Sequence, residues 1–431
     1  MEKNMRFTAK YVIVLLFSII VVYTLNIVIE AQYPIYLQIV MVLNLLFIYS
    51  KFIFSYLYKR RAEKKKTKVD FDEIHHSVDV IIPCYNEDIE VIKSLFESLG
   101  QQDYHIHKII FIDDCSTDTR AYEYVKELKE NYRFDIHLHR LNVNSGKLEA
   151  LMWGIERATS TYLLFLDADG YIATDTIRRL MEPMIMDEKV GAVCGQVVPL
   201  NAKVNHLTKM QTILYYNSYH LGRQFQAYFN RVLVCSGAIS MYQRAVIMED
   251  ITRLKYTKIR NKERKTGDDI ALTNIVINQG YKTVYAELGI CYTSVPTTLK
   301  DFFNQQVRWA KDAYYCFFEE LFSIVRNPLF FLLQFQEVFF WLLSITTFCF
   351  FIYSMNIIFS LEIIGLIILF DTIIYLLNNF YVMEEKVSNF VKVFIYDVEY
   401  RLLLLFIRFY ALLSFGKMSW KKHSTQMRKE A

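Results

Sequence analysis

The sequence contains few of the residues that interrupt helices and strands, and few that could cross-link the chain. Its 431 residues include only six prolines and thirteen glycines, which argues against disordered or low-complexity stretches, and no internal repeat is evident. The seven cysteines are scattered, with no Cys-x-x-Cys pair and no Cys/His cluster at zinc-ligand spacing. We therefore expect reduced, mostly buried thiols and neither disulfides nor a zinc site. The net charge is only +4, and no nucleic-acid partner is expected.

Apolar residues are abundant, and several runs of them are long enough to cross a membrane. Hydrophobic residues make up 53% of the chain and the mean hydropathy is +0.17, which is too apolar for an ordinary soluble enzyme. Residues 11–29 carry no charge and residues 35–57 carry only Lys51, so each run can span roughly 30 Å of hydrocarbon as a helix. Residues 329–360 and 361–383 predict a second hairpin. A signal peptide at 11–29 is disfavoured, because the run is longer than such a segment and a second span follows at once.

Basic residues predict the orientation of these spans. Three of them precede the first hairpin at 3–10, seven follow it at 59–68, and the tail at 417–429 is also basic. Because positively charged flanks stay inside, we expect four crossings, both termini in the cytosol, and a multi-pass protein of the plasma membrane in contact with its lipids. The last apolar stretch, 390–415, carries five charged residues. It is predicted to be an interfacial or re-entrant element, or to line a polar conduit, and both interpretations can hold together.

The middle of the chain has the composition of a globular domain. Runs rich in β-forming residues alternate there with helix-like segments: the runs are 78–82, 108–112, 162–166 and 190–194, and the segments include 88–99 and 146–158. This alternation predicts an α/β fold with a mostly parallel sheet, whose ligands bind beyond the carboxyl ends of its strands. The predicted organisation is a transmembrane hairpin at 1–58, a basic linker at 59–77, a cytosolic catalytic domain at 78–298, interfacial helices at 299–328, a second hairpin at 329–383, and an interfacial or re-entrant element with a basic cytosolic tail at 384–431.

Two carboxylates at a strand end supply the strongest chemical signal. The apolar run Leu163–Leu166 leads into Asp167 and Asp169, which are two positions apart. Residues at that spacing in an extended chain project to the same side, so both carboxylates can approach one divalent cation that also holds a diphosphate. Hard oxygen ligands select Mg²⁺ or Mn²⁺ rather than zinc. An Asp-x-Asp pair also occurs by chance in many proteins, so this motif needs support from others.

Polar residues also follow two other predicted strands and open a predicted helix. Tyr85 and Glu87 follow the first strand, and the Tyr85 ring could stack on a base. Asp114 follows the second strand, where a carboxylate can accept the N–H of a pyrimidine. Lys147 stands at the start of a predicted helix and offers a cation to phosphate. Each residue has an ordinary alternative, since turns and caps use the same residue types and a lysine on a helix face is commonly solvated.

Two further motifs lie in the second half of the chain. Asp268 and Asp269 precede a helix-like segment, where they either cap the helix or supply the base that an inverting sugar transfer needs. Gln305, Arg308 and Trp309 lie on a helical segment just before the second apolar region. The Trp/Arg pair either anchors that helix at the interface or forms a clamp, in which Trp309 stacks on a sugar ring and Arg308 steadies a phosphate or the catalytic carboxylate.

Taken in order, these motifs resemble those of the inverting, processive family-2 glycosyltransferases, which include cellulose, chitin and hyaluronan synthases. The motifs are Pro83-x-Tyr85-Asn86-Glu87, Asp113-Asp114, Gly146-Lys147, Asp167-x-Asp169, Gly267-Asp268-Asp269 and Gln305-x-x-Arg308-Trp309. Further runs look like the single-chain bacterial hyaluronan synthases: Leu233–Gly237, Gly280–Tyr285 and Asn304–Trp309, with Asn327-Pro328 and Glu337 beyond them. The likeness covers nearly the whole chain. It implies a cytosolic GT-A domain, the fold that binds nucleotide-diphospho-sugars, fused to an α-helical transmembrane bundle.

The resemblance implies a role for each matching position. The implied nucleotide-binding residues are Tyr85, Glu87, Asp114, Lys147 and Arg308. Asp169, assisted by Asp167, is implied to bind Mg²⁺ or Mn²⁺ on the diphosphate, and Asp269, next to Asp268, to act as the base. The implied acceptor site is lined by Cys235, Ser236, Gly237, Gln305 and Trp309. The implied reaction transfers sugars from UDP-sugar donors to a growing polysaccharide acceptor and couples synthesis to secretion.

Two departures from the hyaluronan synthase pattern bear on the product. Ile270 stands where those enzymes usually have an arginine after the paired aspartates, and Trp420–His423 keeps only the tryptophan of their Trp-Gly-Thr-Arg loop. The expected product is hyaluronan, made from UDP-N-acetylglucosamine and UDP-glucuronate. The alternatives are a chitin-like or poly-N-acetylglucosamine homopolymer, a non-processive transferase that glycosylates a lipid carrier, and an inactive membrane channel or scaffold.

Overall fold

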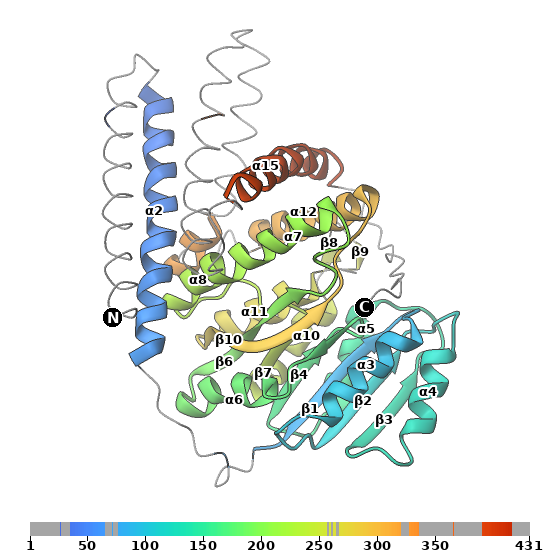
Figure 1. The fold of residues 1–431 in the computed structure, drawn as a ribbon. Coiled ribbons are helices and arrows are strands. Elements are labelled where there is room, and N and C mark those ends of the chain that lie inside the picture. Colours follow the sequence, from blue (N-terminus) through green and yellow to red (C-terminus); the bar gives the residue numbers. More distant parts are fainter. Residues whose placement is uncertain are drawn as a thin grey trace, which may run out of the picture.

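The computed structural model describes residues 26, 35–64, 71, 76–256, 258–259, 262–263, 267–319, 327–335, 365 and 390–415 (Figure 1). An eight-stranded sheet lies at the centre of this part of the chain, in the order β3-β2-β1-β4-β7-β6-β10-β5. A separate two-stranded ribbon pairs β8 (Lys258–Ile259) with β9 (Lys262–Glu263). The α/β architecture predicted for the middle of the chain is thereby confirmed.

The sheet has a parallel half and a mixed half. The parallel strands are β1 (Val78–Cys84), β2 (Lys108–Asp113), β3 (Asp135–Arg140) and β4 (Tyr162–Leu166). The others are β5 (Gly170–Ile172), β6 (Val190–Pro199), β7 (Ile239–Gln243) and β10 (Lys282–Thr293). β7 is antiparallel to both β4 and β6, β5 is antiparallel to β10, and β10 is parallel to β6. All four strands predicted from the sequence are present, and the fourth runs on to Pro199.

Helices flank the sheet on the sides visible in Figure 1. Their bounds are α2 (Ile35–Lys64), α3 (Ile89–Gly100), α4 (Arg120–Leu128), α5 (Lys147–Arg157), α6 (Thr176–Met186), α7 (His206–Asn217), a π-helical turn η1 (Ser218–Arg223), α8 (Gln224–Tyr228), α9 (Arg244–Glu249), α10 (Ile251–Tyr256), α11 (Asp268–Asn278), α12 (Leu299–Glu319) and α15 (Phe390–Leu413).

The boundaries of α3 and α5 follow from their sequences. The Asp88 side chain caps α3 by accepting a hydrogen bond from the backbone N–H of Glu90 at 2.9 Å, and the apolar residues of α3 recur on its buried face. In α5, Gly154 lets the helix approach the sheet closely, because a Cβ there would lie 2.7 Å from the Ile81 side chain of β1. This close packing places the first residue of α5, Lys147, beyond the carboxyl ends of β1 and β4.

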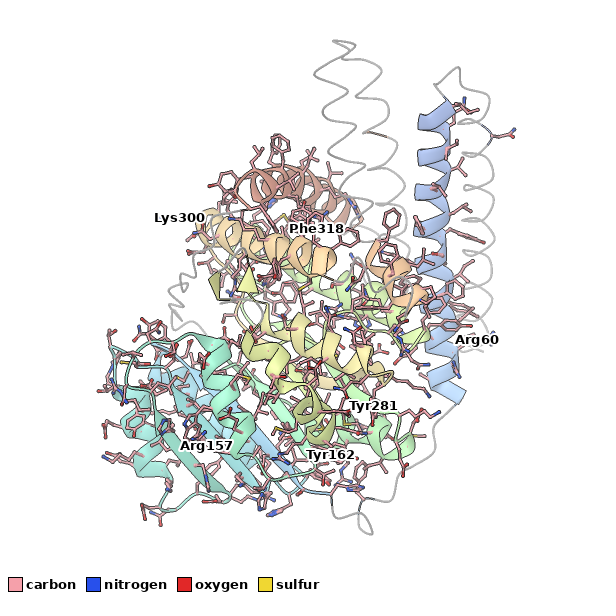
Figure 2. All side chains as sticks on the ribbon, turned by 180° about the vertical axis from the view of Figure 1, so that it is seen from behind. Arg60, Arg157, Tyr162, Tyr281, Lys300 and Phe318 are labelled. Carbon is pink, nitrogen blue, oxygen red and sulfur yellow. The ribbon has the colours of Figure 1, made fainter. Side chains whose placement is uncertain are left out.

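A second layer of helices lies beside the domain that contains the eight-stranded sheet. Figure 2 shows α15 over α12, on which Lys300 and Phe318 are labelled. The buried contacts between α12, α15 and α7 are apolar and include Phe302, Leu404 and Ile407. His206 at the start of α7 pairs with Glu399 of α15, with Nε2 and Oε2 2.5 Å apart. The helix predicted as an interfacial or re-entrant element therefore packs on the helix that carries the Gln-x-x-Arg-Trp motif.

The helix α2 contacts the domain that contains the eight-stranded sheet through polar side chains. The Ser55 hydroxyl donates to the backbone carbonyl of His220 and contacts Oε1 of Gln224, each at 2.9 Å. The Tyr58 hydroxyl donates to the carbonyl of Tyr285 in β10 at 2.7 Å. α2 continues to Lys64, so the first residues of the predicted basic linker are helical.

No helix within the described part of the chain is both long enough and apolar enough to cross a membrane. The predicted span at 11–29 lies outside the described residues except for residue 26, and most of the predicted second hairpin at 329–383 also lies outside them. The four crossings therefore remain predictions from the sequence.

Candidate active site

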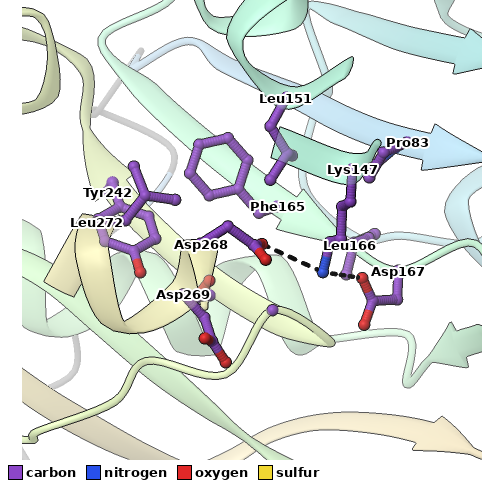
Figure 3. Close-up of a pocket in the computed structure, with 12 residues that line it drawn as sticks. Pro83, Lys147, Leu151, Phe165, Leu166, Asp167, Tyr242, Asp268, Asp269 and Leu272 are labelled. Atoms are coloured by element: carbon purple, nitrogen blue, oxygen red, sulfur yellow. Dashed lines mark ion pairs between the residues drawn. The ribbon is translucent and has the colours of Figure 1, made fainter. Parts of the chain in front are cut away.

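One lysine and three aspartates from separate parts of the chain meet in a cavity beyond β4 (Figure 3). The Nζ of Lys147 lies 2.6 Å from Oδ1 of Asp167 and 3.4 Å from Oδ2 of Asp268. Asp269 lines the same cavity, as does Gly237. These five residues were all predicted as site residues from the sequence, and the fold brings them together.

Backbone geometry at two glycines positions the charged groups. Gly146 precedes α5 with φ 94°, and Gly267 precedes α11 with φ 77°, a left-handed conformation that glycine adopts without strain. At each glycine the chain enters a helix at the next residue. Asp268 and Asp269 thus stand in the first turn of α11, where the helix dipole stabilises negative charge.

Asp269 is buried in this cavity, and its surroundings change its acidity. Burial raises its pKa, and the nearby charge of Asp268 raises it further, although Lys147 acts in the opposite direction. Its Oδ1 accepts a hydrogen bond from the backbone N–H of Ile270 at 2.8 Å. A carboxylate with a raised pKa is a stronger base than an ordinary aspartate, which suits it to deprotonate a hydroxyl.

Asp167 and Asp169 follow β4 as the sequence predicts, but their surroundings differ. Asp167 faces Lys147, whereas Oδ1 of Asp169 accepts a hydrogen bond from the Thr293 hydroxyl of β10 at 3.3 Å. Burial raises the pKa of Asp169 to about 7, aided by the negative charges of Asp167 and Glu87. Glu87 is therefore close enough to act electrostatically on the Asp-x-Asp pair.

The donor chemistry of this pair fits a hard divalent cation held jointly with a ligand. Among the described residues, no three His, Cys, Asp or Glu side chains are grouped so that they could hold a metal ion by themselves. Two carboxylates plus phosphate and water oxygens match the way Mg²⁺ is usually bound, with few protein ligands. Gly170 fixes this segment against β10, since a Cβ there would lie 2.5 Å from the carbonyl oxygen of Tyr292.

The carboxylate of Asp114 forms several hydrogen bonds within the protein. Its Oδ1 accepts the backbone N–H of Ser145 at 2.7 Å, and its Oδ2 accepts the N–H of Gly146 at 2.8 Å and Nδ2 of Asn144 at 3.1 Å. Burial raises the pKa of Asp114 although these backbone donors lower it. In this structure Asp114 therefore orders the loop that leads into Lys147.

The two strand-end loops after β1 and β2 are tied to each other by Asn86. Its side-chain oxygen accepts hydrogen bonds from the backbone N–H groups of Thr117 and Asp118 at 2.8 and 3.2 Å, and its own N–H donates to the Ser116 hydroxyl at 2.8 Å. Asn86 has φ 51°, so it turns the chain sharply between Tyr85 and Glu87. Tyr85 is partly exposed there.

The predicted acceptor segment is connected to Asp269 through a threonine that sequence reasoning missed. The Thr273 hydroxyl accepts the N–H of Cys235 at 2.9 Å and donates to the carbonyl of Asp269 at 2.7 Å. Cys235 itself is fully buried, so its side chain lies beneath the loop, whereas Ser236 is partly exposed. Gly237 lies directly over Lys147, because a Cβ there would be 2.7 Å from Nζ.

The residues of the Gln-x-x-Arg-Trp motif lie on α12, and the ring of Tyr215 on α7 lies near that of Trp309. The Tyr215 ring is 6.4 Å from that of Trp309. Burial raises the pKa of Tyr215, as does the charge of Asp169, while Arg308 lowers it. Gln305 is partly buried, and its Oε1 accepts a hydrogen bond from Nε2 of its neighbour Gln306 at 3.5 Å.

Sequence reasoning missed Tyr215, whose ring lies near that of Trp309, and also Thr273 and Thr293, which form hydrogen bonds with site residues. Tyr215 and Thr273 lie inside helices and Thr293 ends a strand, so none stands in a loop motif that would have marked it. Thr273 follows Asp269 by four positions, which places the two on one face of α11. That spacing was the one signal available in advance.

Comparison with known proteins agrees with this arrangement. Residues 79–250 match the family described as "Glycosyl transferase family 2". A hyaluronan synthase of Streptococcus pyogenes serotype M1 is 31% identical over 355 residues, which cover 80% of this chain and 83% of that protein. An N-acetylglucosaminyltransferase of Neorhizobium galegae is 33% identical over 240 residues, 55% of each protein. Among solved structures, a mannosyltransferase from Pyrobaculum calidifontis in complex with GDP-Man and Mn²⁺ has a TM-score of 0.54 at 16% identity and shares the fold over 88% of this chain and 98% of its own.

The sequence matches, the GT-A-like sheet and the carboxylates at its strand ends agree with one another. The chain therefore belongs to glycosyltransferase family 2 and is a glycosyltransferase related to the hyaluronan synthases.

Proposed function

We propose that the protein is a membrane-integrated, processive β-glycosyltransferase that polymerises UDP-N-acetylglucosamine and UDP-glucuronate into hyaluronan and secretes it. The observation that carries this proposal is the 31% identity to a streptococcal hyaluronan synthase over 80% of the chain. That likeness extends far beyond residues 79–250, where the general family model matches. Relatives that share only the transferase domain would not be similar over this length.

The donor is proposed to bind between the strand-end loops and α5. Tyr85, Glu87 and Asp114 lie on the side of the nucleotide, and Lys147 and Arg308 supply positive charge for the phosphates. Asp167 and Asp169 would hold Mg²⁺ or Mn²⁺, which neutralises the charge that develops on the departing UDP. Support for this comes from their position at the end of β4 beside Lys147.

Asp269 is proposed to be the catalytic base, with Asp268 beside it. The acceptor hydroxyl attacks the anomeric carbon, its proton passes to Asp269, and the bond from that carbon to the diphosphate oxygen breaks. A single displacement of this kind inverts the anomeric centre and yields a β-linked product from an α-linked donor. The raised pKa of Asp269, caused by burial and by Asp268, suits it to the proton transfer.

The acceptor is proposed to lie along Cys235, Ser236 and Gly237 and to reach Gln305 and Trp309 on α12. Trp309 is 41% exposed, so its ring is accessible for stacking on a sugar. Because Cys235 is buried, its segment contributes through the backbone and through Ser236 and Gly237. Thr273 holds this segment in register with Asp269.

The membrane topology proposed is four crossings with both termini and the catalytic domain in the cytosol, on the basis of the basic flanks at 3–10, 59–68 and 417–429. Cysteine labelling from outside should modify a probe at Gln32 or Asn356 and not one at Lys65 or Ser424. External labelling at Ser424 would contradict the proposal.

A homopolymer of N-acetylglucosamine is the second candidate product. It is favoured by the 33% identity to an N-acetylglucosaminyltransferase and by Ile270, which stands where hyaluronan synthases usually have arginine. An anionic donor needs a nearby cation, and the altered run Trp420–His423 lacks the arginine of the usual loop. A non-processive transferase acting on a lipid carrier is the further alternative.

The deciding experiment supplies the purified protein and Mg²⁺ with UDP-N-acetylglucosamine alone, UDP-glucuronate alone, and both together. A long polymer that forms only with both donors and is degraded by hyaluronidase is the expected result. A long chain made from UDP-N-acetylglucosamine alone and degraded by chitinase would replace hyaluronan with the homopolymer. Short, lipid-linked products would favour the lipid-carrier alternative.

A further inference from the structure

A single ammonium group forms ion pairs with two carboxylates at this site and lies near two more. Lys147 forms ion pairs with Asp167 after β4 and with Asp268 on α11, and its charge also acts on Asp169 and Asp269. Within the described part of the chain, it is the one cation that forms an ion pair with any of these four aspartates. The segment after β4 and the first turn of α11, which are far apart in the sequence, are thus linked by one positive charge (Figure 3).

Lys147 carries a positive charge at neutral pH, as a lysine ordinarily does. Its ammonium lies within ion-pair distance of two carboxylates, those of Asp167 and Asp268. At 2.6 Å from Oδ1 of Asp167, the ammonium offsets part of the negative charge that this carboxylate would offer to a metal ion. A divalent cation and an ammonium group repel each other, so the ion pair with Lys147 opposes metal binding at Asp167.

We propose that Lys147 is an internal counter-ion that takes the place of the divalent metal in the donor-free enzyme and is released from Asp167 when metal and donor bind. This inference rests on the proposed metal role of Asp167 and Asp169. The released ammonium remains in the cavity and meets the diphosphate, so the same residue opposes metal binding before the donor arrives and supports donor binding afterwards. It is a positioning residue for the carboxylates in the first state and a phosphate ligand in the second.

Gly237 makes this exchange possible. A Cβ at position 237 would lie 2.7 Å from Nζ and 3.9 Å from both carboxylate oxygens of Asp167, so only glycine leaves room for the ammonium in its present position. The lysine reaches Asp167 from the first turn of α5, where the N-terminus of the helix also attracts the phosphates it would meet next.

The test measures Mn²⁺ binding to the purified full-length protein without nucleotide, followed by UDP binding at saturating Mn²⁺, both at pH 8. Lys147→Met and Lys147→Gln each remove the positive charge. If one variant fails to fold, the other still allows the measurement. Lys93→Met is the matched control, because Lys93 forms an ion pair with Glu90 on the surface of α3. Asp169→Asn tests the metal site itself.

Both Lys147 variants should bind Mn²⁺ about tenfold to a hundredfold more tightly than the wild type without nucleotide, since a competing unit charge has been removed from within a few ångströms. Their affinity for UDP at saturating Mn²⁺ should fall by about tenfold, while Lys93→Met should change neither value. Unchanged or weaker Mn²⁺ binding in both variants would overturn the inference, and unchanged UDP affinity would overturn its second half. If Asp169→Asn binds Mn²⁺ as well as the wild type does, both the proposed metal role and the inference that rests on it are wrong. If Asp169→Asn loses Mn²⁺ binding but the Lys147 variants do not bind Mn²⁺ more tightly, the metal role stands and only the inference is wrong.

Discussion

Alanine at position 237 is expected to impair catalysis without destabilising the fold. The backbone of Gly237 is not left-handed, so a methyl group there introduces no backbone strain. The added Cβ would, however, lie 2.7 Å from Nζ of Lys147, whereas ordinary contact begins at 3.4 Å. Because Nζ is the end of a flexible side chain, it should move by roughly 0.7 Å or more, and the 2.6 Å ion pair with Asp167 should break.

The size of the effect follows from the contact between the ammonium and the diphosphate, which the displaced lysine should no longer make. A hydrogen bond between charged groups contributes roughly 1.5–3 kcal/mol, and about 1.4 kcal/mol corresponds to a tenfold change in rate. If the displaced ammonium no longer meets the diphosphate, kcat/KM should fall by about tenfold to a hundredfold. The free energy of unfolding should change by less than about 1 kcal/mol, because no core contact is disturbed.

UDP release with both donors and Mn²⁺ would measure the rate, and thermal unfolding of the same preparations would measure stability. Gly222→Ala is the matched control, since a Cβ at Gly222 would have nothing within 4 Å. In a Lys147→Met background, Gly237→Ala should have no further effect, because the atom it displaces is absent. Wild-type turnover of Gly237→Ala, or an equal loss in the control, would refute the reasoning.

Three other predictions concern single aspartates. Asp269→Asn should abolish sugar transfer while UDP binding, measured by calorimetry, stays near the wild-type value, and Asp169→Asn should instead weaken metal-dependent UDP binding; equal loss of UDP affinity in both would contradict this division of roles. Since burial and Asp268 raise the pKa of Asp269, and the base must be ionised, the rate should begin to fall with decreasing pH above the ordinary aspartate value of about 3.9, and a pH–rate profile that stays flat down to that value would disprove it. Asp79→Asn should lower stability by about 2–4 kcal/mol, because the buried Asp79 carboxylate accepts hydrogen bonds from Thr159, Ser160 and His107 and an amide nitrogen cannot; chemical denaturation should show this, with turnover at low temperature unchanged.

The location of the chemistry could be predicted from the sequence because it follows local rules. β4 is apolar throughout and buried, so it was visible as a strand, and the polar residues after it had to fall at its carboxyl end. The helix starts near Asp88 and Lys147 were likewise predicted within a residue or two, from capping and from apolar periodicity. Order along the chain then linked the motifs to a family.

The second half of the sheet was harder to predict for a physical reason. β5 has three residues and β7 has five, and both owe their place to hydrogen bonds with neighbours that are distant in the sequence. β7 inserts antiparallel between β4 and β6, a pairing that local β propensity does not specify. The hydrogen bonds of Asp114 were hidden for the same reason, since its partners at 144–146 come from a separate loop.

The sequence by itself determined which groups the protein can use: carboxylates at strand ends, a lysine at a helix start, and an aromatic and arginine pair on one helix. Those assignments depend on residue type and on neighbours close along the chain. Only the tertiary structure decided how the groups act on one another, because Lys147, Asp167, Gly237 and Asp268 belong to four segments that meet only after the sheet has formed. Electrostatic coupling falls off with distance in space and not with separation in sequence, so the shared ammonium and the raised pKa of Asp269 were visible only in the folded chain.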